Sequence, residues 1–151
     1  MAEFWRLIGS SSIGDASDID VALTEISRRL ASLNPFELVQ FSERLKEALY
    51  RLDRREFGEI PVALMDGREF PQTSDHFLYA RCACVMAGGE VYSRVLQSGV
   101  GFDHFVKPSL QRAEGLLYIA SNVYEAKTGE KIKLKSGVSV ESMSNTDGWL
   151  S

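Results

Sequence analysis

The strongest structural signal in the chain lies in residues 15–52, whose sequence is DASDIDVALTEISRRLASLNPFELVQFSERLKEALYRL. Its first half carries apolar residues at alternating steps of four and three, at Ile19, Leu23, Ile26, Leu30 and Leu33. This spacing places all five side chains on one stripe of an α-helix, because a helix completes a turn every 3.6 residues or so. The pattern predicts a helix that begins near Asp15, with Asp15, Ser17 or Asp18 as its cap.

A second helix begins almost at once, at the sequence Asn34-Pro35-Phe36-Glu37. Asn34 fits the N-cap, Pro35 fits the first helical position because its missing N–H costs nothing there, and Glu37 completes a capping box. The apolar stripe of this second helix is Leu38, Phe41, Leu45, Leu49 and Leu52. Since the connection between the two helices is so short, we expect an antiparallel helix pair in which each helix buries its stripe against the other and against later segments of the chain.

Further helices are expected on both sides of this pair. They cover residues 4–8, 74–88, 91–99 and 109–127. Thr73 or Ser74 fits the cap of the second of them, and Gly129 fits the stop signal of the last. Between these helices, residues 53–73 are punctuated by Gly and Pro, so we expect only a short helix around 54–60 and then a loop. Residues 99–108 are expected to form a second loop.

After Gly129 the pattern changes from helical to alternating. Residues 131–135 alternate lysine with apolar residues, and residues 138–141 alternate again after a possible turn. Alternation of this kind is typical of a half-buried extended chain and predicts either a β-hairpin or an extended tail. Because an isolated hairpin is marginal in water, we expect residues 129–151 to pack on the helices and Trp149 to plug against their core.

The composition agrees with an ordinary globular domain. The chain has 151 residues, 44% of them hydrophobic and 25% charged, with 17 Lys or Arg against 21 Asp or Glu and a net charge of -4. We therefore predict a mainly α protein: one compact helical domain over residues 1–151, with about six helices and an extended or β-hairpin-like C-terminal tail.

The same composition argues against several classes of protein. An acidic total argues against nucleic acid as the primary partner, and the two local basic clusters, at residues 51–55 and 127–135, are expected to be solvated faces. The only cysteines, Cys82 and Cys84, lie in an apolar segment, which favours buried thiols and a cytoplasmic location over a disulfide framework. The longest apolar stretch, residues 77–87, is too short to span a membrane.

Several short motifs resemble a bacterial family. They are Phe4-Trp5-Arg6-Leu7-Ile8, residues 74–81 followed by Gly88 and Tyr92, Leu116-Leu117-Tyr118 with residues 124–129, and Ser144-Asn145 before Gly148-Trp149. Together they are similar to the domain of unknown function family 4240 over nearly the whole chain. The resemblance implies a small, mostly helical, cytoplasmic bacterial protein and supplies no reaction. This chain departs from the family pattern at Ser74 and Asp75, where the family usually has a pair of acidic residues, and at Ala83, where it often has Trp.

Arg81 is the charged residue whose position most needs an explanation. It lies between Phe77 and Cys84 on the stripe of its helix that faces the core, so its guanidinium is expected to lose its water. A buried charge of this kind needs a carboxylate or several carbonyl groups as partners. Two interpretations stay open: a structural arginine that holds loops or a helix C-terminus, and a receptor for an anion at the floor of a pocket.

The candidate ligand-binding residues are Asp75, His76, Tyr79, Arg81 and His104. Each of the two histidines follows an aspartate, so an acid–base pair or a metal site would form if the two segments met. Neither segment has the spacing of metal ligands on a helix face, and Asp75 is well explained by the helix dipole. We therefore predict no metal, no cofactor and no catalytic residue.

Two functions are consistent with this pattern. The first is a non-enzymatic interaction or accessory protein, of an immunity-type or stress-associated kind, that binds a protein partner. It is favoured because the sequence shows no catalytic constellation. The alternative is a binding protein or an enzyme for a small anionic ligand, with its site around Arg81. The oligomeric state is not determined by the sequence.

Overall fold

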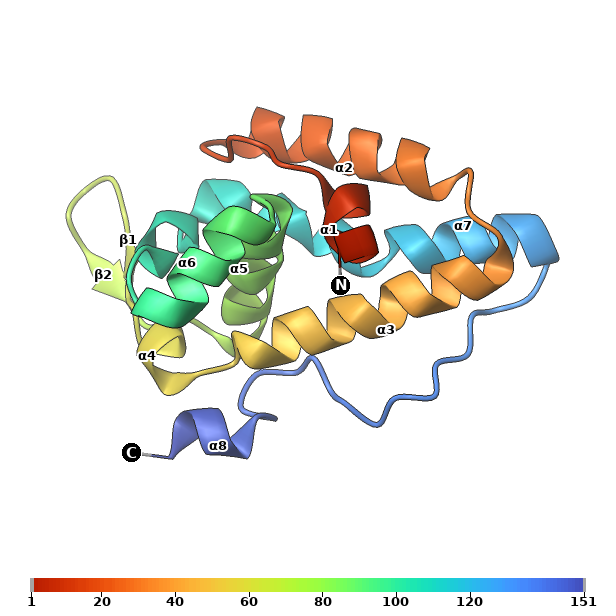
Figure 1. The fold of residues 1–151 in the computed structure, drawn as a ribbon. Coiled ribbons are helices and arrows are strands. Elements are labelled where there is room, and N and C mark those ends of the chain that lie inside the picture. The colour runs from red at the N-terminus through yellow and green to blue at the C-terminus, as the bar shows by residue number, and fades with distance from the viewer. Residues whose placement is uncertain (1, 151) are drawn as a thin grey trace.

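The computed structural model describes residues 2–150 and is mainly α-helical, which confirms the predicted fold class (Figure 1). The α-helices are α1 (Ala2–Ile8), α2 (Ala16–Leu30), α3 (Pro35–Arg51), α4 (Arg55–Gly58), α5 (Ser74–Met86), α6 (Gly89–Ser98), α7 (Ile119–Thr128) and α8 (Thr146–Trp149). Two 3-10 helices, η1 (Phe102–Phe105) and η2 (Pro108–Leu117), and two short strands, β1 (Val62–Ala63) and β2 (Glu69–Phe70), complete the described chain. The strands pair antiparallel, with Val62 opposite Phe70.

Helices α2 and α3 begin where the sequence predicts, and both carry a complete capping box. The Asp15 carboxylate accepts the backbone N–H of Asp18, and the Asp18 carboxylate accepts that of Asp15. Asn34 and Glu37 exchange the same two bonds at 2.9 and 3.0 Å. These bonds satisfy N–H groups that the first turn of a helix leaves without partners, so the starts of both helices are fixed locally.

The apolar stripes of α2 and α3 are buried, but not mainly against each other. Helix α7 runs between them and contacts both, while η2 packs on α2 and on α5, and α1 also contacts both α2 and α3 (Figure 1). The expectation of two helices packed directly on each other is therefore wrong. A helical period shows which face of a helix is buried, whereas the element that covers the face depends on the rest of the chain.

The long helix expected over residues 109–127 is two elements, η2 and α7, which meet at Tyr118. Gly115 lies close to α2 just before this junction. A Cβ on Gly115 would lie 2.9 Å from Cδ1 of Leu23, so the glycine permits the close approach of η2 and α2. Because η2 is wound more tightly than an α-helix, the single helical stripe that the sequence suggests is not continuous.

Two of the expected loops contain structure. Residues 99–108 include η1, whose Phe102 and Phe105 are buried, and the Phe102 ring stacks on Phe57 of α4 with centroids 4.9 Å apart. Residues 54–60 contain the expected short helix, α4, and the chain then forms the β1–β2 pair. The aromatic contacts explain why these short elements are ordered, since each ring buries a large apolar area.

Helix α5 lies at the centre of the fold and is buried on almost every side. It packs against η2, α3, η1 and α6. Cys82 and Cys84 both point into buried surroundings as free thiols, as predicted, and burial raises the pKa of each to about 12. Both thiols therefore stay protonated and behave as small apolar groups. None of the described helices combines the length and the apolarity needed to cross a membrane.

The C-terminal tail is an extended chain and not a hairpin. After α7 it runs back along α3 and ends in the single turn of α8 (Figure 1). From residue 131 to residue 140 the side chains alternate strictly between exposed and partly buried, while no strand is formed in this described segment. The alternation predicted from the sequence is confirmed, and it arises because every second side chain rests on the helices.

Gly88 joins α5 to α6 with a φ of 106°, a conformation that favours glycine. A Cβ there would lie 2.9 Å from the carbonyl oxygen of Gly9 and 2.7 Å from Oγ of Ser10. We expect Gly88→Ala to lower the free energy of unfolding by about 2 kcal/mol, measured by urea denaturation. Gly137→Ala is the matched control, because a Cβ at Gly137 would meet no atom within 4 Å. Equal urea midpoints for the two variants would contradict the expectation.

Candidate functional site

Arg81 is fully buried, at 0% exposure, and its guanidinium donates to three oxygen atoms. Nη1 donates to the carbonyl oxygen of Leu49 at 3.0 Å, and Nη2 donates to the carbonyl oxygen of Val140 at 3.0 Å and to Oγ of Ser142 at 3.1 Å. The guanidinium also lies over the Phe77 ring, 4.5 Å from its centroid. These are the partners expected for a structural arginine.

Arg81 connects the end of α3 to the C-terminal tail through its hydrogen bonds. Leu49 lies in the last turn of α3, where carbonyl groups lack helical partners and the dipole favours a cation. Burial lowers the pKa of Arg81, and the nearby carboxylate of Asp53 opposes this effect. A guanidinium nevertheless keeps its charge in proteins. Its three acceptors and the nearby Asp53 offset part of the cost of burial, and its Nε has no hydrogen-bond partner within the described chain. One interpretation of the sequence, an arginine that holds a helix C-terminus and a loop, describes this geometry.

Asp53 is a second buried charge, and sequence reasoning missed it. Its carboxylate accepts the backbone N–H of Met143 at 3.0 Å and that of Asn145 at 2.9 Å, and Nε1 of Trp149 at 2.8 Å. One local signal was present: Asp53 follows the C-cap of α3, Leu52, at the end of the helix where the dipole disfavours an acid. Its partners lie at least 90 residues further along the chain, and no local pattern predicts them.

Arg81 and Asp53 therefore hold the same C-terminal segment. We call residues 130–150 the C-terminal strap. Trp149 of the strap lies against Gly58, where a Cβ would be 2.5 Å from its ring, and meets the Phe77 ring edge to face at 6.1 Å. The prediction that Trp149 plugs against the helical core is confirmed. The strap is thus fastened by buried polar groups and by an aromatic anchor.

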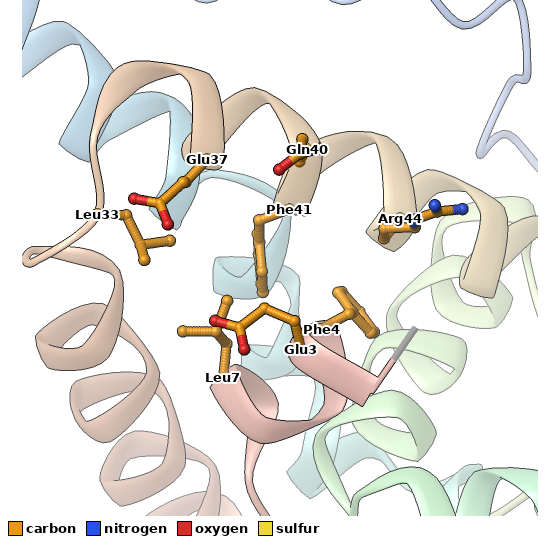
Figure 2. Close-up of a pocket in the computed structure, with 8 residues that line it drawn as sticks. All are labelled: Glu3, Phe4, Leu7, Leu33, Glu37, Gln40, Phe41 and Arg44. Atoms are coloured by element: carbon orange, nitrogen blue, oxygen red, sulfur yellow. The ribbon is translucent and has the colours of Figure 1, made fainter.

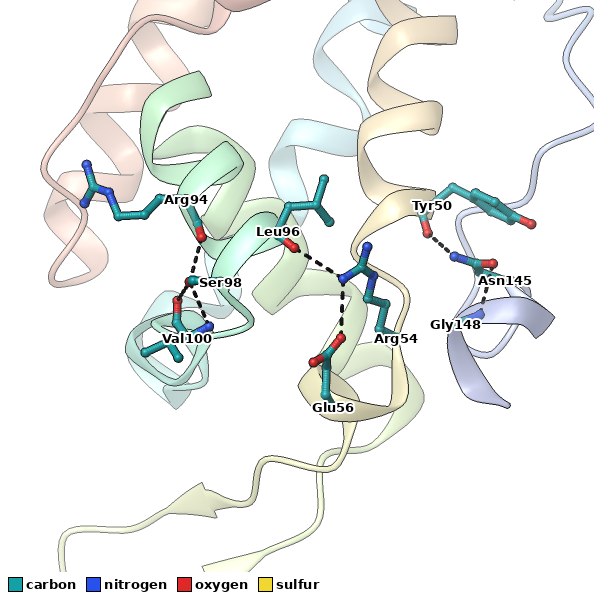
Figure 3. A network of polar contacts seen from close by, with 9 residues as sticks. All are labelled: Tyr50, Arg54, Glu56, Arg94, Leu96, Ser98, Val100, Asn145 and Gly148. Carbon is teal, nitrogen blue, oxygen red and sulfur yellow. Dashed lines mark hydrogen bonds and ion pairs between the residues drawn. The ribbon is translucent and has the colours of Figure 1, made fainter. Parts of the chain in front are cut away.

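Figure 3 shows the polar contacts beside this anchor. Nδ2 of Asn145 donates to the carbonyl oxygen of Tyr50 at 3.1 Å, which ties the strap to the last turn of α3. Next to it, Nη1 of Arg54 donates to the carbonyl oxygen of Leu96 at 3.3 Å and lies 3.4 Å from the carboxylate of Glu56 (Figure 3). The segment after α3 is therefore bonded both to the strap and to the end of α6.

Of the five candidate residues from the sequence, Asp75 and Tyr79 line one cavity. This cavity has a volume of about 420 Å³ and lies between α3, α5, the η2–α7 junction and the strap. Burial raises the pKa of Tyr79 to about 12, and the nearby carboxylate of Glu114 adds to the effect. Asp75 is exposed in the first turn of α5, whose N-cap is Thr73. Arg81 is not part of this lining.

The two histidines have separate partners. Nδ1 of His76 lies 3.3 Å from the amide oxygen of Gln72, and burial lowers the pKa of His76. Nε2 of His104 instead lies within hydrogen-bond distance of the carbonyl oxygen of Ile13, before the start of α2. Within the described residues no group of three or more His, Cys, Asp or Glu side chains is placed to hold a metal ion.

A small pocket and a large groove lie on adjacent faces of α3 and share Gln40 and Arg44 in their linings. The small pocket, of about 210 Å³, lies between α1 and α3 (Figure 2). Phe4, Leu7 and Phe41 give it an apolar floor, and charged side chains stand around its mouth (Figure 2). Its volume is below the range of most small-molecule sites.

The large groove, of about 930 Å³, lies between α3 and the strap, and we call it the α3–strap groove. It is lined by Phe36, Val39, Gln40, Glu43, Arg44, Glu47, Tyr50, Arg51, Lys133, Lys135, Ser136 and Val138. Two further hollows continue it along the strap. Tyr50 lines all three hollows, and Arg51 lines two of them. The groove therefore continues past Tyr50 into a longer depression.

Fold and site together define a small, mainly α-helical protein whose C-terminal strap is held over the helices by two buried charges. The chain belongs to the family of proteins of unknown function DUF4240, whose sequence pattern matches residues 1–126. This confirms the family resemblance seen in the sequence. The strap lies beyond the matched residues. Comparisons with curated proteins and with solved structures find no match.

Proposed function

We propose that this protein is a non-enzymatic interaction module that binds a partner protein in the α3–strap groove. The proposal rests on the hydrogen bonds that the two buried charged residues, Arg81 and Asp53, form with the strap. Arg81 donates to the strap as well as to Leu49 of α3, Asp53 accepts three hydrogen bonds from the strap, and the strap forms one wall of the groove. The two buried charged side chains therefore help to position a wall of the α3–strap groove. An accessory protein of an immunity-type or stress-associated kind would use such a surface.

The residues of the groove support this proposal. Phe36 is 70% exposed at one end of α3, although a large aromatic side chain is costly to leave in water. Tyr50 and Arg51 lie at the other end of the same groove. Aromatic residues and arginine contribute most to binding energy at protein interfaces, and an exposed apolar patch rimmed by polar groups is typical of such interfaces.

The alternative, a site for a small anion around Arg81, has less support. An anion would have to replace the carbonyl groups of Leu49 and Val140 as acceptors, and those groups would then lose their donor in a buried place. We further propose a cytoplasmic location, because the two buried thiols, Cys82 and Cys84, suit a reducing compartment.

Site-specific photo-crosslinking in the source cells tests the proposed function. A benzophenone amino acid is placed at Phe36 or Val39 in the groove, and at Val21 as the control. Val21 is 65% exposed on α2 and lines neither the groove nor the hollows beside it. We expect one adduct of the same mass from both groove positions and none from Val21, and we expect Arg51→Glu to weaken that adduct. The proposal fails if the groove positions give no adduct, or if Val21 gives the same one.

A further inference from the structure

The strap offers an open backbone edge in addition to the groove. From residue 131 to residue 140 no backbone–backbone hydrogen bond is formed within the described chain. Five side-chain contacts fasten this part. Glu43 accepts the backbone N–H groups of Lys135 and Ser136 at 2.7 and 3.1 Å, and Lys46 donates to the carbonyl oxygen of Ser136 at 3.1 Å. The Val138 N–H donates to Oγ of Ser136 at 3.1 Å, and Arg81 donates to the carbonyl oxygen of Val140 at 3.0 Å. The backbone groups of residues 131–134 and of Gly137 have no hydrogen-bond partner within the described chain. An extended chain whose backbone groups lack partners is a template to which a second extended segment adds as a strand.

A row of lysines follows this edge. Lys131, Lys133 and Lys135 occupy alternate positions and all are exposed, so they project on the same side of the extended chain. Lys133 and Lys135 line the groove together with Arg51 of α3. Within the described residues no carboxylate lies within salt-bridge distance of Lys133, Lys135 or Arg51. The groove therefore has a local excess of positive charge in a chain whose net charge is -4.

The acidic side chains of the groove do not cancel this excess. Glu43 is already bonded to two backbone N–H groups of the strap, and Glu47 pairs with Arg44 at 3.3 Å. Lysines on an open edge also prevent uncontrolled strand pairing. The same lysines favour an acidic segment in the groove, because negative side chains are attracted to them whereas neutral or basic strands are not.

The dimensions of the groove suit an extended occupant. From Phe36 to Arg51 the helical wall is about 22 Å long. A segment of about six or seven extended residues has this length. Along the wall, the apolar surfaces of Phe36, Val39 and Val138 can receive every second side chain of such a segment. The remaining side chains would then face the basic groups.

We infer that the α3–strap groove binds an extended segment of a partner protein in which acidic residues alternate with apolar ones, and that this segment adds as a strand through the free backbone groups of residues 131–134 and Gly137. The inference rests on the proposed function and names the chemistry of the partner. Hydrogen bonds to the open edge supply affinity for an extended chain, whereas Arg51, Lys133 and Lys135 supply the preference for acidic residues.

Fluorescence anisotropy with the full chain tests this inference. The probe is a labelled peptide of about eight residues that alternates Glu with Leu. Its controls are the same peptide with Lys in place of Glu, the same acidic peptide with methylated backbone nitrogens, and a labelled single-stranded oligonucleotide. We expect the acidic peptide to bind, and its affinity to fall about tenfold or more with methylation, with high salt, and with the double variant Lys133→Glu/Lys135→Glu. Lys127→Glu, in the last turn of α7, is the matched control and should leave binding unchanged.

The outcomes separate the inference from the proposed function. Equal or tighter binding of the lysine peptide or of the oligonucleotide would overturn the inference, as would full binding of the methylated peptide. If the acidic peptide does not bind while the adduct at Phe36 persists, the inference is wrong and the proposed function stands. If the adduct is also absent, both are wrong.

Discussion

Asp53→Ala is expected to lower the free energy of unfolding by about 4 kcal/mol and to release the C-terminal strap. Asp53 is 0% exposed and accepts three hydrogen bonds from the strap, so its removal leaves three N–H groups without acceptors in or near the core. It also removes the negative charge that stabilises the buried guanidinium of Arg81. Urea denaturation followed by circular dichroism measures the loss of stability.

Native-state proteolysis measures the release of the strap separately. Trypsin cleaves after lysine, and Lys131, Lys133 and Lys135 lie in the strap. In the wild type Glu43 and Lys46 hold residues 135 and 136 on α3, and Arg81 and Asp53 hold the strap further on, so this segment must leave α3 before trypsin can bind it in full. In Asp53→Ala we expect cleavage there to become faster while the helical core stays intact under folding conditions.

Two variants control this prediction. Asp66→Ala removes an exposed carboxylate that pairs only with Arg68, and it should change stability by less than about 0.5 kcal/mol. Asp53→Asn keeps one oxygen acceptor and should fall between the wild type and Asp53→Ala. A loss of stability in Asp53→Ala no larger than that in Asp66→Ala would show that Asp53 does not anchor the strap.

The parts of the fold that the sequence predicts well are those set by nearby residues. The capping boxes at Asp15 and Asn34 place the starts of α2 and α3 correctly, because donors and acceptors three residues apart decide a cap. The buried position of Arg81 also follows from a local period. In each case the deciding interaction lies within about one helical turn of the residue itself.

Features that depend on distant segments were not predictable in this way. The alternation in residues 131–140 predicts a half-buried extended chain, but the partner surface turns out to be α3 instead of a second strand. The role of Asp53 depends on groups about 90 residues away. Likewise, the apolar stripes of α2 and α3 indicate buried faces without showing that α7 lies between them. Patterns of period two or 3.6 describe which side chains need cover, and long-range topology decides what covers them.

The candidate site also combines features that local spacing predicts with features that depend on distant segments. The burial of Arg81 can be predicted because it depends on spacing, yet its three acceptors come from α3 and the strap. The groove cannot be predicted in the same way, because its two walls are separated by some 80 to 100 residues of chain. The lysine row and Phe36 are visible in the sequence as separate features. Only the course of the strap brings them to one surface.

A double-mutant cycle tests whether the contributions of Arg81 and Asp53 to stability are coupled. We expect Arg81→Met to lower the free energy of unfolding by about 3 kcal/mol, because the carbonyl groups of Leu49 and Val140 lose their donor and Asp53 loses a nearby countercharge. Methionine keeps much of the volume of the side chain, so the cavity contribution is small. Urea denaturation of both single variants, Arg81→Met and Asp53→Asn, and of the double variant completes the cycle.

The double variant should be more stable than the sum of the two single effects predicts, by about 1–2 kcal/mol. Two physical reasons act in the same direction. Each single change leaves one charge buried without its opposite, whereas the double change leaves neither. In addition, both residues fasten the same strap, so a strap already loosened by the first change has less to lose from the second. Additivity within about 0.5 kcal/mol would mean that the two charges stabilise the fold independently, and the strap would then be held by two separate contacts.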